Sequence, residues 1–227
     1  MLRKIRSLVS NSEDFFGIYD NALSKKECEI LINQFEKSDK VKPGLTTTGY
    51  HPEAKSCRQI TCNFKDKSII DNILKPSLIS CLDSYKSRYL SLKYSFWWRY
   101  YDGYSFQKYD GEDDGYKIWH TEHLAGALSH RIIVWMVYLN DAKSGTQFKH
   151  YPNVRAKRGR IVLWPSGWTH VHRGAPNKGV KYVLSGWYSY DHDPIFDYDK
   201  HSQHDNTLTE KAEVNDGGFS TVPNLSS

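Results

Sequence analysis

Apolar positions in the first ninety residues recur at helical spacing. A short apolar run at residues 15–19 is followed by Ser24, and Glu27 stands three positions further on, which is the pattern of a helical capping box. The apolar side chains that come next are three or four residues apart: Cys28, Leu31, Ile32 and Phe35. The pattern predicts a short strand that leads into a helix over residues 25–38.

A second helical pattern begins near residue 69. Its apolar positions are again spaced by three or four residues: Ile70, Ile73, Leu74, Leu78, Cys81, Leu82 and Tyr85. Pro76 lies inside this run and is expected to kink or divide the helix, because proline lacks a backbone N–H. Residues 41–63, between the two helical patterns, are polar and rich in turn residues. They predict a long loop with short strand pieces, of the kind that closes over a binding site.

After Lys93 the pattern changes to short β-type segments separated by Gly, Pro, Asn and Asp. These segments cover residues 94–101, 105–109, 131–139, 159–164, 168–172 and 180–190. Short strands at such even spacing are typical of a β-sandwich or barrel. The fold class predicted is therefore mostly β, with two N-terminal helices flanking the sheet.

Composition narrows this picture to one soluble domain. The chain of 227 residues is expected to form a single domain over residues 1–190, followed by a polar tail, residues 191–227, that is partly disordered. The net charge of +5 comes from Lys and Arg interleaved with 26 acidic residues, without a basic stripe, which argues against nucleic-acid binding. The sequence does not indicate an oligomeric state.

Cysteine usage and hydropathy suggest a cytoplasmic protein. The four cysteines lie within the first 81 residues without a C-x-x-C pair, and the first ten residues lack an apolar run of signal length. Free thiols in a reducing compartment are expected. Nowhere do 18 apolar residues occur together, so no membrane segment is predicted.

Candidate chemistry starts at residues 119–122, Trp-His-Thr-Glu. His120 and Glu122 are two residues apart, so an extended backbone points both side chains to the same side. A lone His-x-Glu occurs by chance in many proteins. Further along, the sequence Trp-Thr-His-Val-His at residues 168–172 brings His170 and His172 onto another expected strand. Two histidines and one carboxylate are the donor set of non-haem iron(II) oxygenases, which leave metal positions open for a 2-oxo acid and dioxygen.

A lysine on the last predicted strand needs an anion. Alternation along residues 181–188 places four side chains on one face: Lys181, Val183, Ser185 and Trp187. If that face is the interior of a barrel, the ammonium is costly to bury unless an anionic group pairs with it. The distal carboxylate of 2-oxoglutarate would supply such a group.

Taken together, these motifs resemble the prolyl 4-hydroxylase-like 2-oxoglutarate oxygenases over roughly residues 15–190. The resemblance starts at Asp-Asn-Ala-Leu-Ser, residues 20–24, and continues through Phe-Gln-Lys-Tyr, residues 106–109, ahead of the His-Thr-Glu motif. It extends over the strand that ends Tyr-Leu-Asn-Asp at residues 138–141, the turn Gly-Thr-Gln-Phe at 145–148, and Arg-Ile-Val-Leu-Trp-Pro at 160–165. The sequence departs from the family pattern at two places. The turn at 144–146 has one glycine where the family usually has two, and Glu122 stands where Asp is commoner.

The resemblance implies a double-stranded β-helix (jelly-roll) core and an iron(II)- and 2-oxoglutarate-dependent oxygenase. The implied iron ligands are His120, Glu122 and His172. Of the two neighbouring histidines, His172 has the family's spacing to Pro176 and Lys181, which leaves His170 beside the ligands or the substrate. Lys181 and Tyr138 would bind the distal carboxylate of 2-oxoglutarate, and Tyr109 points into the same pocket. Trp119, Trp187 and Arg173 are further candidates for the rim or the substrate side.

The implied reaction hydroxylates an unactivated C–H with release of succinate and carbon dioxide, with oxygen as co-substrate and ascorbate as an optional reductant. The expected substrate is a prolyl residue of a peptide or protein. The alternatives are the same chemistry on another side chain or a small molecule, a non-catalytic jelly-roll binding module, and a nucleic-acid demethylase, which the absence of a basic aromatic surface disfavours. Most tryptophans other than Trp119 are expected in the core.

Overall fold

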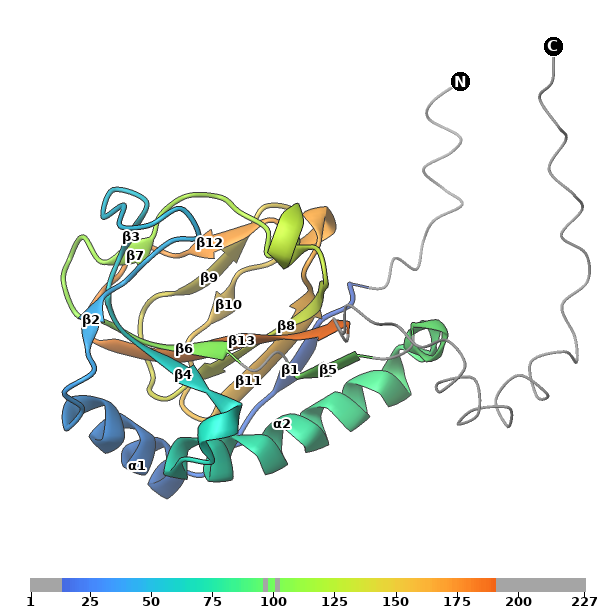
Figure 1. Cartoon of the computed structure of the whole chain (residues 1–227), viewed down its shortest axis with the longest axis horizontal. Coiled ribbons are helices and arrows are strands. Elements are labelled where there is room, and N and C mark those ends of the chain that lie inside the picture. The colour runs from blue at the N-terminus through green and yellow to red at the C-terminus, as the bar shows by residue number, and fades with distance from the viewer. Residues whose placement is uncertain (1–13, 96–97, 101–102, 191–227) are drawn as a thin grey trace, which may run out of the picture. The chain divides into compact units, whose positions relative to one another are not determined.

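An antiparallel sheet of eight strands forms the framework of the protein, and two helices pack along one side of it (Figure 1). The computed structural model describes residues 14–190, apart from 96–97 and 101–102. Seven strands follow one another across the sheet in the order β1 (Gly17–Tyr19), β11 (Arg160–Pro165), β8 (Arg131–Tyr138), β13 (Lys181–Tyr190), β6 (Gly103–Tyr109), β4 (Arg58–Asn63) and β2 (Lys42–Pro43). The eighth strand, β5 (Trp98–Tyr100), pairs with the end of β13. The predicted tail, residues 191–227, lies outside the described residues, and the extent of the single domain stays a prediction.

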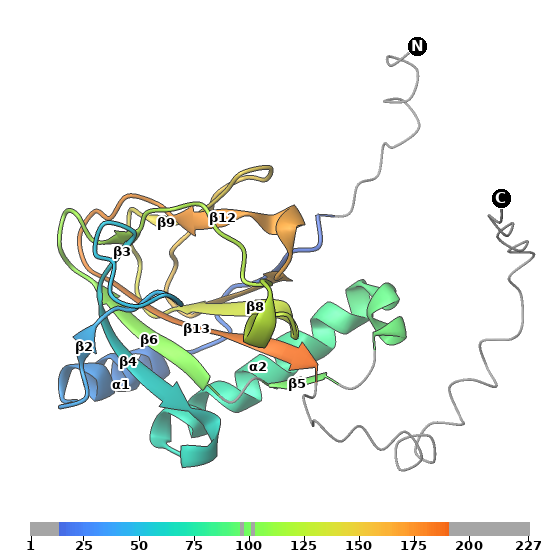
Figure 2. The same cartoon turned by 45° about the horizontal axis from the view of Figure 1, so that its top comes forward.

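Two smaller sheets lie across from the main sheet. One consists of β10 (Val154–Arg155), β9 (Gly145–Phe148) and β12 (His172–Gly174), and the other of β3 (Lys55–Ser56) and β7 (Gly115–Tyr116). Figure 2 shows β3, β9 and β12 on the side of the main sheet that faces away from the helices. Two layers of antiparallel strands that enclose a core are the arrangement of a double-stranded β-helix. The predicted fold class is confirmed.

Both predicted helices form. Helix α1 (Lys25–Glu36) begins with the expected capping box, in which Ser24 and Glu27 satisfy each other's backbone N–H groups. Helix α2 (Ile69–Arg88) has a second capping box, formed by Ser68 and Asp71. Of the two effects expected of Pro76, a kink or a division, division does not occur, because α2 is continuous through it. None of the helices in the described part of the chain is long and apolar enough to cross a bilayer.

Alternation along β8 separates two cores. Ile133, Trp135 and Val137 point toward the helices and join the core that α1 and α2 cover. Val134 and Tyr138 point to the opposite side, into the second core between the sheets. Gly186 on the neighbouring β13 gives Trp135 its space, because a Cβ there would lie 2.4 Å from the indole ring. The main sheet therefore presents one face to the helices and the other to the interior of the double-stranded β-helix.

Three local predictions need correction. Residues 168–172 are not one strand: Trp168–His170 form a 3₁₀ turn, and β12 begins only at His172. The loop predicted at residues 41–63 is shorter than expected, since its last six residues form β4, a full strand of the main sheet. Trp135 and Trp164 are buried as expected, but Trp168 is 81% exposed because the turn directs it outward.

Candidate active site

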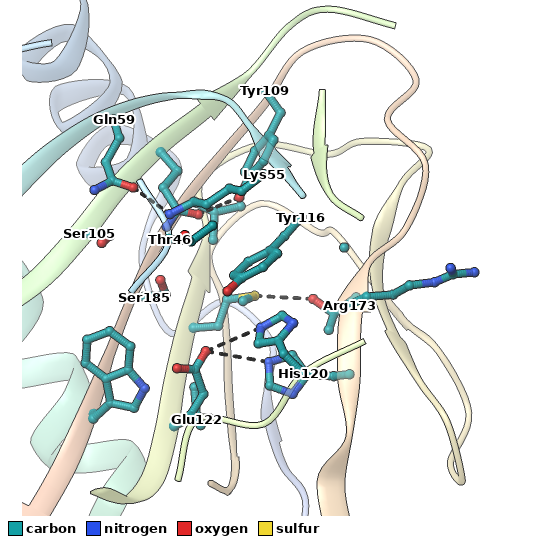
Figure 3. A pocket seen from close by; sticks show the side chains of 18 of the residues that line it. Thr46, Lys55, Gln59, Ser105, Tyr109, Tyr116, His120, Glu122, Arg173 and Ser185 are labelled. Carbon is teal, nitrogen blue, oxygen red and sulfur yellow. Dashed lines mark hydrogen bonds and ion pairs between the residues drawn. The ribbon is translucent and has the colours of Figure 1, made fainter. Parts of the chain in front are cut away.

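A cavity of about 280 Å³ lies between the main sheet and the smaller sheets (Figure 3). One strand contributes four of its lining side chains, which are the four that alternation predicted: Lys181, Val183, Ser185 and Trp187. The candidate ligands His120, Glu122 and His172 line the same cavity. The structure therefore brings together the charged lysine and the three ligand candidates, which the sequence separates by up to 61 positions.

The three ligand candidates converge on one point. One ligand atom from each of His120, Glu122 and His172 lies within 4.8 Å of the other two. The Nε2 atom of His120 is 3.6 Å from Oε1 of Glu122, and the Nε2 atom of His172 is 3.8 Å from the same oxygen. Figure 3 shows the imidazole of His120 directed at the carboxylate of Glu122. This is a compact set of two nitrogen donors and one oxygen donor.

Backbone carbonyls fix the orientation of both imidazoles. Nδ1 of His120 lies 3.0 Å from the carbonyl oxygen of Ile118, and Nδ1 of His172 lies 2.9 Å from that of His170. A carbonyl can only accept, so each Nδ1 carries the proton and donates it. Each Nε2 is then left with its lone pair directed into the cavity, which is the tautomer that a metal ligand needs.

Electrostatics favour the ligand forms of these groups. Burial by itself would raise the pKa of Glu122, but the neighbouring His120 and His172 outweigh burial and hold that pKa below its usual range. Burial lowers the pKa of His172, so its imidazole is neutral near pH 7. An ionised carboxylate and a neutral imidazole are the forms that bind a metal ion.

Arg131 holds the carboxylate and was not predicted as a site residue. Its Nη1 atom donates to Oε2 of Glu122 at 3.1 Å, while Oε1 faces the two histidines. The guanidinium also stacks on the ring of Trp187, 3.4 Å from the ring centre. A charged residue at the head of the apolar strand 131–138 was the signal available in the sequence.

Lys181 is buried in the cavity without an acidic partner. Its side chain is 3% exposed, and its ammonium lies 4.7 Å from the centre of the Tyr109 ring. Within the described part of the chain no carboxylate forms an ion pair with it, and burial lowers its pKa to about 8. A buried ammonium of this kind is prepared to receive an anionic ligand.

Two tyrosines border the same part of the cavity. The hydroxyl groups of Tyr138 and Thr146 share a hydrogen bond of 2.6 Å, and Tyr109 donates to Oε1 of Gln107 at 2.6 Å. Both tyrosines line the cavity, and Tyr109 pairs with Lys181 in the register of β6 and β13. Burial raises the pKa of Tyr138 to about 12, so its hydroxyl remains a donor at neutral pH.

His170 does not belong to the cavity lining. Its Nε2 atom lies 3.0 Å from the carbonyl oxygen of Asp14, and its ring stacks on Tyr151 at 4.7 Å. The expectation that His170 and His172 share one face of a strand is therefore wrong, because the 3₁₀ turn directs His170 into the packing around Phe16. His170 contributes to the site only through its carbonyl group.

Trp119 and Arg173 pair with each other beside the cavity. The guanidinium of Arg173 lies 4.4 Å from the centre of the Trp119 ring, and Trp119 is 40% exposed. Arg173 also donates from Nε to Gln147 at 2.9 Å. Figure 3 shows its guanidinium pointing away from His120 and Glu122. This pair forms part of the outer rim, so the guanidinium of Arg173 does not bring positive charge to the interior of the cavity.

Comparison with known proteins finds a family model that matches part of the chain. Residues 104–189 match the family model of the 2OG-Fe(II) oxygenase superfamily, a segment that contains the three ligand candidates and Lys181. No curated protein matches the sequence.

Several solved structures share the fold. A prolyl hydroxylase from Trichoplax adhaerens, in complex with a hypoxia inducible factor oxygen degradation domain peptide fragment, is 16% identical, with a TM-score of 0.62 over 88% of this chain and 90% of that chain. A Pseudomonas putida prolyl-4-hydroxylase is 14% identical, with a TM-score of 0.60 over 84% of this chain and 100% of that chain. The non-heme alpha ketoglutarate dependent epimerase SnoN from nogalamycin biosynthesis is 11% identical, with a TM-score of 0.57 over 78% and 79%.

Identities this low establish the fold, whereas the family model covers the part of the chain that contains the three ligand candidates and Lys181. The cofactor and co-substrates of that superfamily are iron(II), 2-oxoglutarate and dioxygen, and the cluster of two histidines and one glutamate fits the metal. Residues 104–189 therefore match a 2OG-Fe(II) oxygenase domain, and the chain is a 2-oxoglutarate-dependent oxygenase with a prolyl 4-hydroxylase-like fold.

Proposed function

We propose that this oxygenase hydroxylates a prolyl residue of a peptide or protein, with iron(II) bound by His120, Glu122 and His172. The observation that carries the proposal is the convergence of these three donors on one side of a cavity whose other lining includes an unpaired, buried lysine. Such a combination of donors and counter-charge supports chemistry with iron(II) and 2-oxoglutarate at this site.

The donor set suits iron(II). Imidazole and carboxylate groups bind it well, and three protein ligands leave positions for other molecules. Glutamate reaches one methylene further than the commoner aspartate. The contact of Arg131 with Oε2 compensates for that freedom, because it holds the longer side chain in one orientation.

We assign the binding of 2-oxoglutarate to Lys181, with Tyr138 and Tyr109 beside it. The ammonium and the hydroxyl of Tyr138 would bind the distal carboxylate, so that the 2-oxo acid end lies toward the ligand triad. The burial of Lys181 makes this contact strong, since a desolvated ion pair is weakly screened.

Bound iron(II) with 2-oxoglutarate and oxygen supplies the oxidising power that inserts oxygen into an unactivated C–H, with release of succinate and carbon dioxide. The chain supplies position and environment. Glu122 and the two histidines hold the reaction centre, and the apolar side chains of Val134, Met136 and Val183 limit water in the cavity.

The assignment of a prolyl substrate is supported by two structural neighbours. Both are prolyl hydroxylases, and one of them contains a peptide. The exposed side chain of Leu45, on the segment that leads to β3, lines the cavity and provides apolar surface for an extended chain. The neighbouring epimerase favours a second candidate, the same chemistry on a small molecule.

The test is substrate-dependent formation of succinate by protein loaded anaerobically with iron(II) and then exposed to oxygen. Peptides that contain proline are compared with the same peptides carrying alanine in its place, and products are analysed for the gain of one oxygen atom. Stimulation by the proline peptides alone, and its loss in His172→Ala, supports the proposal. Equal turnover with both peptide sets, or oxygen on another residue, would contradict a prolyl target.

A further inference from the structure

A second lysine is buried in the same cavity. Lys55 lies on β3 and is 5% exposed, and its ammonium is directed to the interior (Figure 3). It donates to the carbonyl oxygen of Leu45 at 2.9 Å and to Oε1 of Gln59 at 2.7 Å. Both acceptors are neutral. Of the described residues, none forms a carboxylate ion pair with Lys55, and burial lowers its pKa.

The cavity contains more positively charged side chains than the metal and the co-substrate would pair with. Among the described lining residues, Glu122 is the only carboxylate, whereas Lys55, Lys181 and Arg131 bring positive charge to the interior. Arg131 pairs with Glu122. Iron(II) and the two carboxylates of 2-oxoglutarate together add no net charge, so Lys55 and Lys181 leave two positive charges in the cavity, and Lys181 is assigned to the co-substrate. Lys55 therefore remains without a counter-charge when the cofactor and co-substrate are bound.

The surroundings of Lys55 are those of a substrate subsite. The same cavity is lined by uncharged polar side chains of β4, β6 and β13: Gln59, Thr61, Ser105, Gln107 and Ser185. Figure 3 shows Tyr116 between Lys55 and the ligand triad. The ring of Tyr116 stacks on His120 at 3.8 Å and faces the Lys55 ammonium at 5.6 Å. A group bound at Lys55 would thus be one aromatic ring away from a metal ligand.

Lys55 and Lys181 are held by different parts of the chain. Lys181 begins β13 and contacts Tyr109, whereas Lys55 lies on β3 and donates to the carbonyl oxygen of Leu45, a half-exposed residue that also lines the cavity. The Lys55 ammonium therefore contacts a segment that reaches the protein surface.

We propose that Lys55 binds a carboxylate of the substrate and so selects an acidic substrate for this oxygenase. The inference rests on the proposed hydroxylase function. The carboxylate belongs either to an aspartate or glutamate next to the target residue in a peptide, or to the terminus of a free amino acid. Lys55 would act as a specificity residue, because it touches the substrate and not the reacting atoms.

The experiment measures binding without turnover. Protein loaded anaerobically with iron(II) and 2-oxoglutarate is titrated into fluorescent prolyl peptides that carry Asp or, as the matched neutral set, Asn within two positions of the proline. Free L-proline and L-prolinamide compete for the same site. The variants are Lys55→Met, which removes the charge at similar length, and Lys117→Met, an exposed lysine outside the cavity lining, as the control for net charge.

The wild type is expected to bind the carboxylate form roughly 10- to 100-fold more tightly than the amide form, as for a charged hydrogen bond in a desolvated site. Lys55→Met should lose this preference, while Lys117→Met should keep it. Preference among peptides identifies a side-chain carboxylate, and preference for proline over prolinamide identifies a free amino acid.

Three results would overturn the proposal: equal binding of acid and amide by the wild type, no binding of any carboxylate ligand, or a preference that survives in Lys55→Met. A weaker affinity for 2-oxoglutarate in Lys55→Met would also overturn it, since Lys55 would then serve the co-substrate. Failure of the proposed reaction has a different signature: the acidic ligands bind through Lys55, yet no succinate and no hydroxylated product form on admission of oxygen.

Discussion

His120 and His172 form a backbone pair in which each residue donates to the other. The N–H of His120 lies 2.9 Å from the carbonyl oxygen of His172, and the N–H of His172 lies 3.0 Å from that of His120. Through these hydrogen bonds the two residues join the main chain of the segment at 118–123 to that of β12. Their side chains are thus brought together by the main chain before any metal binds, and removing one imidazole should leave the pairing intact.

The first prediction separates His172 from His170. His172→Ala should abolish stoichiometric iron(II) binding and also cost about 2 kcal/mol of unfolding free energy, because its imidazole is both a ligand and a buried, hydrogen-bonded ring. His170→Ala should bind iron(II) normally but lose about 2 kcal/mol of stability, since its buried ring contacts Asp14 and Tyr151. Anaerobic metal titration and urea unfolding measure the two effects. Loss of iron from His170→Ala would show that the ligand assignment is wrong.

A second prediction concerns Arg131. Arg131→Met should weaken iron(II) binding roughly 10- to 100-fold, because Glu122 loses the contact that orients its carboxylate. Arg173→Met is the matched control, since that guanidinium stacks on Trp119 at the rim and should leave the affinity unchanged. Equal losses in the two variants would point to a general charge effect instead of orientation.

The affinity for 2-oxoglutarate should depend on pH through Lys181. The pKa of this ammonium is about 8 in the free protein, below the ordinary 10.5, because the group is buried. A bound dianion raises that pKa, so binding above pH 8 requires uptake of a proton. The dissociation constant should therefore be constant below about pH 8 and rise by up to about tenfold per pH unit above it.

Two variants check the origin of this dependence by equilibrium dialysis in the presence of iron(II). Lys181→Arg should remove the rise, because arginine keeps its charge, and Lys181→Met should bind weakly at every pH. A rise that persists unchanged in Lys181→Arg would assign the titration to another group.

A fourth prediction tests the single glycine of the turn at 144–146. A Cβ on Gly145 would lie 2.0 Å from the carbonyl oxygen of Val154, so β10 could not keep its pairing with β9. Gly145→Ala should cost about 2–3 kcal/mol of unfolding free energy. Gly167→Ala, where a Cβ meets nothing within 4 Å, should change stability by less than about 0.5 kcal/mol. Chemical denaturation of both variants provides the measurement.

The sequence predicted those parts of the site that depend on local periodicity. Alternation placed Lys181, Val183, Ser185 and Trp187 on one face, and the structure puts all four in the cavity. The same reasoning placed His120 and Glu122 side by side, and the capping box of α1 followed from Ser24 and Glu27.

Features that depend on long-range pairing could not be predicted in this way. Lys55 is buried because β3 pairs with β7, sixty residues further along the chain, and nothing local marks it among exposed lysines. His170 and Trp168 were misplaced because the backbone after Gly167 forms a 3₁₀ turn, and that turn redirects both side chains. Pro76 is accommodated because the rest of a twenty-residue helix packs on the sheet around it.

The pairing of β1 with β11 has a consequence for how the chain reaches its native state. Ile18 lies opposite Val162 in the register, so a segment near the start of the chain finds its partner only after more than 140 further residues have been made. Such non-local contacts slow folding, because the entropy of closing a long loop is spent before the contact forms. During synthesis β1 has no partner strand until β11 has been made. Until the two strands pair, β11 is an open edge of the sheet. Closure of the sheet along β1 should therefore be a late, rate-limiting event in folding.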